Sequence, residues 1–225
     1  MAVNKNHQEG FSDASDKHTT MKKGFFIVIE GADGCGKSTH AKLLGKYLKE
    51  KGYDVVVTRE PTRGPIGLAI RDILAGRAKA SPSALTLFFT ADRADHVDTV
   101  IKPALKEGKV VITDRYYYST VAYQSVQGIK TTWISQLNSF VPEPDLVVVL
   151  KIESEAALAR MSGRQLEVFE VLNFQKKVQE ALLNLAYGAR SKLSKPGKVW
   201  KIISTATPIE QTQEKIRDVV DKYLK

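Results

Sequence analysis

Near the start of the sequence, one run of residues has the types and spacing that hold a chain of phosphates. Gly31 to Ser38 read GADGCGKS, which fits the pattern G-x-x-x-x-G-K-[ST]. Glycines let the backbone wrap a phosphate closely and point successive N–H groups at it, while Lys37 reaches the β- and γ-phosphates. The Ser38 hydroxyl is available as a ligand for Mg²⁺. The pattern therefore predicts a site for a nucleoside triphosphate and its metal ion.

The sequence on either side of this run supports the same interpretation. Phe25 to Glu30 (FFIVIE) is typical of a strand buried on both faces, and Ser38 to Glu50 spaces its apolar residues as an amphipathic helix does. A strand, a glycine-rich turn and a helix in this order indicate a P-loop, whereas a chance glycine-rich turn, the alternative, would lack that context. The predicted ATP-binding residues are Gly31, Ala32, Asp33, Gly34, Cys35, Gly36, Lys37, Ser38 and Thr39.

Further apolar runs follow along the chain, and helical patterns separate them. They are Val55 to Thr58, Val110 to Thr113, Leu146 to Ile152 and Val199 to Ile203. Strands that alternate with helices need right-handed crossovers, and these produce a mostly parallel sheet with helices on both faces. The pattern predicts a three-layer α/β fold.

Length and composition suit one large domain rather than two. The chain has 225 residues, of which 43% are hydrophobic and 26% charged. We expect a single kinase domain over residues 23–225, with a lid at about residues 160–170, and a disordered leader over residues 1–22, which are polar and have no hydrophobic period. No apolar run approaches the roughly 20 residues that cross a membrane. Because the leader also lacks a secretory signal, we expect a cytoplasmic protein with no membrane partner.

The net charge and the cysteine content limit which ligands and which cysteine chemistry to expect. A formal net charge of +9 favours anionic ligands. Nucleic acid is not expected, because aromatic residues are not interleaved with basic ones as stacking platforms require. Cys35 is the sole cysteine, which excludes an internal disulfide and a thiol cluster for zinc. It occupies a free position of the P-loop pattern, so we interpret it as a small filler residue and not a redox switch.

A second charged pair lies at the end of a predicted strand. In VVITDRYYYS, Asp114 and Arg115 follow the strand at the carboxyl edge of the sheet, where open α/β folds bind ligands. Asp114 would support the Mg²⁺ ion together with Ser38. The alternative is a salt bridge at the strand end with no role in binding.

These segments together resemble the thymidylate kinases. The shared motifs are FIVIEGADGCGKST, TREP (Thr58 to Pro61), FFTADRADHV (Phe88 to Val97) and DRYYYSTVAYQ (Asp114 to Gln124), and they cover about half of the chain. The resemblance implies a five-stranded parallel sheet with surrounding helices. It also implies ATP-dependent, Mg²⁺-dependent phosphorylation of thymidine monophosphate, by a protein that is usually a homodimer.

The resemblance also assigns roles by matching position. Asp33 would face the acceptor nucleotide, and Arg115 would hold the acceptor phosphate with a bidentate grip. Phe89 would stack on thymine and Arg93 would donate to its O4, although Phe89 taken alone would be interpreted as core packing. Tyr123 would pack against the deoxyribose. The implied acceptor-site residues are Arg59, Glu60, Pro61, Phe89, Arg93, Arg115, Ser119, Thr120 and Tyr123.

One position departs from the pattern of some members of the family. They carry an arginine after the acidic P-loop residue, where this chain has Gly34. We therefore expect Arg160 and Arg164, in ARMSGRQ, to meet the charge of the transition state, with a solvated basic helix end as the alternative. The predicted catalytic residues are then Lys37, Asp33, Arg115, Arg160 and Arg164.

Two other classes of protein remain open at this level. One is a related kinase that acts on another base or on a nucleoside, and the other is a P-loop nucleotide-binding protein that is not an enzyme. Thymidylate and deoxyuridylate differ by one methyl group, worth about 1 to 3 kcal/mol, so the sequence leaves that choice open.

Overall fold

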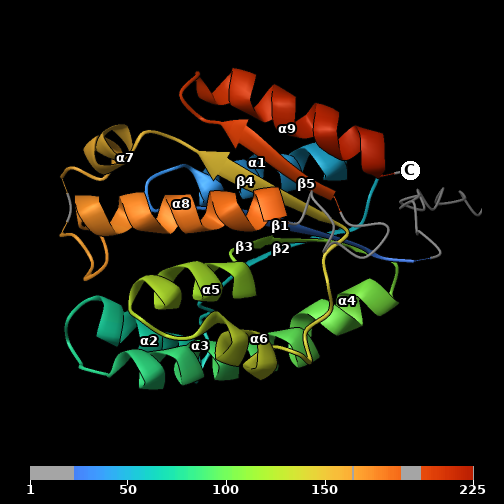
Figure 1. Ribbon diagram of the computed structural model, residues 1–225. Coiled ribbons are helices and arrows are strands. Elements are labelled where there is room, and N and C mark those ends of the chain that lie inside the picture. The colour runs from blue at the N-terminus through green and yellow to red at the C-terminus, as the bar shows by residue number, and fades with distance from the viewer. Residues whose placement is uncertain (1–22, 164, 189–198, 225) are drawn as a thin grey trace, which may run out of the picture.

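The computed structural model describes residues 23–163, 165–188 and 199–224. Its centre is a parallel sheet of five strands in the order β2-β3-β1-β4-β5. The strands are β1 (Phe25–Gly31), β2 (Val55–Arg59), β3 (Val110–Asp114), β4 (Leu146–Lys151) and β5 (Val199–Ser204). Their carboxyl ends all point to the same edge, on the left in Figure 1.

Helices connect the strands and cover both faces of the sheet (Figure 1). In chain order the elements are α1 (Lys37–Glu50), α2 (Pro65–Leu74), α3 (Pro82–His96), the π-helical turn η1 (Val97–Ile101), α4 (Lys102–Lys106), α5 (Tyr117–Val126), α6 (Thr131–Leu137), α7 (Ser154–Arg160), α8 (Leu172–Gly188) and α9 (Ile209–Tyr223). This is the expected three-layer α/β fold, so that prediction is confirmed.

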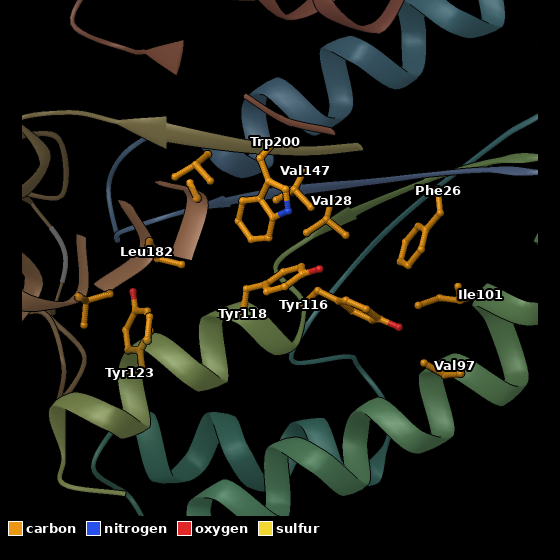
Figure 2. Close-up of a cluster of buried hydrophobic side chains, with 14 of the residues drawn as sticks. Phe26, Val28, Val97, Ile101, Tyr116, Tyr118, Tyr123, Val147, Leu182 and Trp200 are labelled. Atoms are coloured by element: carbon orange, nitrogen blue, oxygen red, sulfur yellow. The ribbon is translucent and has the colours of Figure 1, made fainter. Parts of the chain in front are cut away.

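Alternation along the central strands explains the two layers of core. Successive side chains of a strand point to opposite faces of the sheet. Ile27 and Ile29 of β1 therefore pack toward α1 and α9, and Phe26 and Val28 pack toward the helices on the other face. Figure 2 shows this second cluster, in which Tyr116 and Tyr118 lie beneath Val28 and Val147, and Trp200 lies beside Val147. Both faces of β1 are apolar because both are buried.

The expected strands are present, and only their boundaries differ. β1 continues to Gly31, β3 takes in Asp114, and β4 stops at Lys151 and does not include Ile152. Strand ends are set by where the ladder pairing stops, which propensity does not fix. The predicted leader at residues 1–22 lies outside the described residues.

Buried side chains between α1 and the sheet should dominate the stability. We expect Leu44→Ala, at a position that is 0% exposed on α1, to lower the free energy of unfolding by about 2 to 5 kcal/mol, because it removes methyl groups and leaves a cavity. Leu166→Ala, at a position that is 48% exposed, should change it by less than about 0.5 kcal/mol. Urea unfolding of both variants measures the difference, and equal losses would contradict this assignment of the core.

Candidate active site

The P-loop turns between β1 and α1 with two glycines in the left-handed region. Gly34 has φ of 77° and Gly36 has φ of 94°. A Cβ on Gly34 would lie 2.3 Å from the carbonyl oxygen of Ala157 on α7. No side chain fits there without a shift of the backbone, which accounts for the glycine where some relatives have arginine. The Lys37 ammonium is buried against the loop and donates to the Ala32 carbonyl over 2.8 Å.

Ser38 and Asp114 form a small oxygen site beside the loop. The Ser38 hydroxyl donates to Oδ2 of Asp114, while the buried Oδ1 has no hydrogen-bond partner among the described residues. An unpartnered buried carboxylate oxygen beside a hydroxyl suits a hard cation. The residues that the structure describes include no cluster of three or more His, Cys, Asp or Glu that could ligate a metal. This donor set fits Mg²⁺, which usually takes one or two protein oxygens, with water and phosphate completing its shell.

Arg115 lies in the turn between β3 and α5 and points toward the P-loop. Its φ of 73° is in the left-handed region, which is costly for a residue with a side chain. The guanidinium forms an ion pair with the Asp33 carboxylate, donates to the Ser119 hydroxyl over 2.9 Å, and lies 5.0 Å from the centroid of the Tyr123 ring. The turn after β3 therefore directs a cation at the P-loop.

Glu30, at the end of β1, holds this turn in place. Its Oε1 accepts from the backbone N–H groups of Tyr116 and Ser119 over 2.9 and 3.1 Å, and its Oε2 accepts from the Ser119 hydroxyl over 2.6 Å. Burial raises the pKa of Glu30, and the hydrogen bond from Ser119 and the charge of Arg115 oppose that rise without cancelling it. The buried Glu30 side chain thus stabilises the turn that carries Arg115.

Asp33 in the P-loop contacts both the segment after β3 and helix α8. Tyr123 donates to its carboxylate over 2.8 Å, and Gln175 on α8 both donates to the carboxylate and accepts from the Asp33 N–H. Burial raises the pKa of Asp33, but the charges of Arg115 and Lys37 outweigh that effect and hold the pKa below its usual value. Asp33 is therefore ionised at neutral pH.

Arg93 on α3 lies among the residues of the site, and protein groups surround its side chain. Its Nε donates to Oε2 of Glu60 over 2.9 Å, and its Nη2 lies 2.7 Å from the same oxygen. Nη2 also donates to the Thr120 hydroxyl over 3.0 Å, and Nη1 donates to Asn138 over 2.7 Å. The side chain is 1% exposed. Its orientation is therefore set by the protein before any ligand binds.

These groups surround one cavity of about 700 Å³ at the carboxyl edge of the sheet, which is within the size range of nucleotide sites. Every implied acceptor-site residue lines it, as do Asp114 and the P-loop residues Asp33, Gly34, Gly36, Lys37, Ser38 and Thr39. Gly31, Ala32 and Cys35 are not among the lining residues, and Cys35 is completely buried.

Of the two arginines predicted to act from a lid, only one lies among the described residues. Arg160, the last residue of α7, lines the cavity and donates to the carbonyl oxygen of Thr205 over 2.9 Å. Arg164 lies outside the described residues.

Sequence reasoning missed several residues of the cavity. Arg71 on α2 lines it and donates to the Pro61 carbonyl, and burial together with the charge of Arg59 lowers its pKa. The signal in the sequence for Arg71 was its position next to the apolar Ile70 in an amphipathic helix, where an arginine could face a ligand. Gln175 lies 142 positions from Asp33 and carries no local signal. Thr205, Thr207 and Pro208 in the loop after β5, and Ile209 at the start of α9, also line it.

The site defines a class of protein. A P-loop lysine and an arginine from a second strand end, which line one cavity, form the arrangement of a P-loop phosphotransferase, which holds a phosphate donor and an acceptor together. The chain belongs to the thymidylate kinase family, whose model matches residues 29–216. The resemblance inferred from the motifs is confirmed.

Individual relatives agree with the family match. A probable thymidylate kinase of Thermococcus gammatolerans is 47% identical over 173 residues, which are 72% of this chain and 83% of that protein. A probable thymidylate kinase of Pyrococcus abyssi is 39% identical over 209 residues, or 90% and 98% of the two chains. A bacterial thymidylate kinase from Desulfotalea psychrophila is 41% identical over 167 residues, or 73% and 83%.

The ion pair of Asp33 should appear in the acid stability of the protein. A carboxyl whose pKa is lower in the folded state stabilises the fold above its unfolded pKa, near 3.8, and loses that contribution as the pH falls through the folded pKa. We expect Asp33→Asn to flatten the decline in stability between about pH 5 and pH 2. Chemical unfolding across that range measures it, and parallel curves for the variant and the wild type would contradict the assignment.

Proposed function

We propose that the protein transfers the γ-phosphoryl group of ATP directly to thymidine 5'-monophosphate, which gives ADP and thymidine 5'-diphosphate. The observation that carries this proposal is the position of Arg115, which pairs with Asp33 of the P-loop at a cavity that Lys37, Phe89 and Arg93 also line. Phosphoryl transfer needs little beyond positioning and charge neutralisation, and two cationic groups that line one cavity supply both.

The P-loop side would hold the donor. Its backbone N–H groups and the start of α1 would bind the phosphates, and Lys37 would exchange the Ala32 carbonyl for phosphate oxygens. Ser38 and Asp114 would hold Mg²⁺, which supplies charge neutralisation on the phosphates when bound. The unpartnered Oδ1 of Asp114 supports this assignment.

The opposite wall would hold the acceptor phosphate. Arg115 would turn part of its guanidinium from Asp33 to the phosphate, and Ser119 would keep the remainder in place. Asp33 would face the same nucleotide, and Tyr123, whose hydroxyl donates to Asp33, would pack against the deoxyribose.

The base would be recognised by Phe89 and Arg93, which lie on one face of α3. A guanidinium has five N–H donors. Arg93 donates from Nε to Glu60, from Nη2 to Thr120 and from Nη1 to Asn138, and Nη2 also lies 2.7 Å from Glu60, so one Nη1 donor has no acceptor among the described residues. The remaining Nη1 donor would meet the O4 carbonyl of thymine. The same donor would meet an amino group in cytosine, which leaves it unpaired.

The lid would complete the charge around the transferred group. Gly34 has no room for a side chain beneath Ala157, so the charge must come from another direction. We propose Arg160 for this role, acting from the end of α7, with Arg164 as the second lid arginine.

Three further properties stand as proposals. The chain would consist of a leader at residues 1–22 and a single kinase domain at residues 23–225. The protein would be cytoplasmic and would form a homodimer. The exposed apolar residues Leu87 and Phe88 on α3 and Leu68 on α2 support a helical dimer surface. No helix among the described residues is long and apolar enough to cross a membrane.

ADP release with ATP, Mg²⁺ and a panel of nucleoside monophosphates tests the activity. We expect thymidylate to be preferred to deoxycytidylate in kcat/KM by roughly 10⁴ to 10⁵, because the wrong base leaves buried polar groups unpaired. Arg93→Ala should reduce kcat/KM for thymidylate by roughly 10- to 100-fold and weaken the preference. Hydrolysis of ATP that ignores every acceptor would indicate a nucleotide-binding protein, and an unchanged base preference in Arg93→Ala would refute the role of Arg93.

The dimer surface can be tested separately. Leu87→Glu should convert the dimer to a monomer, because it places a charge in the centre of an apolar contact. Sedimentation equilibrium measures the mass, with Tyr187→Glu, at an exposed position on α8, as the matched control. A wild-type monomer, or a dimer that survives Leu87→Glu, would contradict the proposal.

A further inference from the structure

A chain of polar side chains runs from the half-buried Thr58 near the end of β2, through buried residues, to the acceptor pocket. The Thr58 hydroxyl lies 2.7 Å from Nε2 of His96, and Nδ1 of His96 lies 3.1 Å from Oε1 of Glu60. Glu60 then pairs with Arg93 through its other oxygen. His96 and Arg93 are 1% exposed and Glu60 is 3% exposed. Sequence analysis assigned no role to His96.

The two oxygens of Glu60 have different partners, which decides what Arg93 can do. Oε2 takes the Nε and Nη2 groups of Arg93, and Oε1 takes Nδ1 of His96. An ionised carboxylate only accepts hydrogen bonds. Nδ1 of His96 is therefore the protonated ring nitrogen, and its N–H donates a hydrogen bond to Oε1 of Glu60. While His96 holds Oε1, one Nη1 donor of Arg93 has no protein acceptor among the described residues.

Without His96 the carboxylate would be free to rearrange. A buried carboxylate oxygen with no partner is costly, and the nearest cation is the guanidinium of Arg93. Arginine and carboxylate prefer a bidentate pairing, in which each oxygen accepts from a different nitrogen. Such a pairing would bring Oε1 onto Nη2, draw Nη2 off the Thr120 hydroxyl and shift the guanidinium from the position that Thr120 and Asn138 fix, which would change the direction of the free Nη1 donor.

His96 also separates two cavities. Glu60 and Arg93 line the main cavity, whereas Thr58 and His96 line a second cavity of about 490 Å³ that shares Ser38, Arg59 and Asp114 with the first. The imidazole is therefore a wall as well as a hydrogen-bond partner. A small residue in its place would let water from the second cavity reach Glu60.

We propose that His96 is a positioning residue for base recognition, because it holds Glu60 so that Arg93 keeps one N–H donor directed at the acceptor base. The inference rests on the proposed role of Arg93. His96 contacts no substrate in this scheme and acts only through Glu60.

Three substitutions separate this role from a purely structural one. His96→Asn keeps a side-chain amide near the position of Nδ1, which is the atom that contacts Glu60. His96→Gln extends its amide to the position of Nε2, which contacts Thr58, and His96→Ala removes both bonds. We expect His96→Ala and His96→Gln to raise the KM for thymidylate by roughly tenfold and to weaken the preference over deoxycytidylate. His96→Asn should restore both quantities, and the KM for ATP should stay unchanged in all three variants.

A neighbouring core residue provides the matched control. Val97, the next residue, is completely buried but belongs to the apolar cluster and not to this chain of hydrogen bonds. Val97→Ala should lower the melting temperature and leave the base preference intact. The inference is wrong if base preference follows melting temperature across all four variants, or if His96→Asn and His96→Gln behave alike.

Arg93→Ala distinguishes failure of this inference from failure of the proposed function. If Arg93→Ala weakens the base preference while His96→Ala matches the wild type, the role of His96 alone is refuted. If Arg93→Ala leaves the preference intact, the proposed reading of the base is refuted and the role of His96 falls with it.

Discussion

The ion pair between Arg115 and Asp33 is the constraint on which the rest of the site depends. It joins the turn after β3 to the P-loop after β1, and adjacent parallel strands bring these two segments to one edge of the sheet. Its geometry requires a left-handed backbone at Arg115, and three hydrogen bonds to Glu30 hold that turn. The fold therefore carries one strained residue and one buried carboxylate to keep a cation directed at the phosphate loop.

Buried charge in the site is arranged in balanced groups. Asp33 faces Arg115, and Glu60 faces Arg93, each with further hydrogen bonds that satisfy the remaining atoms. Breaking such a pair is more costly than the pair is stabilising, because the remaining charge stays buried. These pairs are better understood as fixing the positions of two arginines than as sources of stability. Both arginines are then oriented before a substrate arrives, which reduces the entropy lost on binding.

Much of this could be predicted from the sequence, for physical reasons. Strands buried on both faces read as continuous apolar runs, and the P-loop is local in the chain, so β1, its turn and α1 were predicted nearly to the residue. The cavity brings together the residues of the four motifs, although their individual roles remain predictions. Gln175 and the link from His96 to Glu60 could not be predicted, because they depend on contacts between distant segments. The strand ends differed because ladder pairing, not propensity, sets them.

The close contact between Gly34 and Ala157 has a consequence for how this enzyme can be altered. The backbone of α7 rests directly on the phosphate loop, so the two segments must shift together if either shifts. An arginine transplanted into the loop from a relative would first have to push that helix aside, and Arg160 at its end would be displaced as well. If Arg160 supplies the cation, as proposed above, an arginine at position 34 could not act together with it in this backbone, and changing from one to the other would require a redesigned lid.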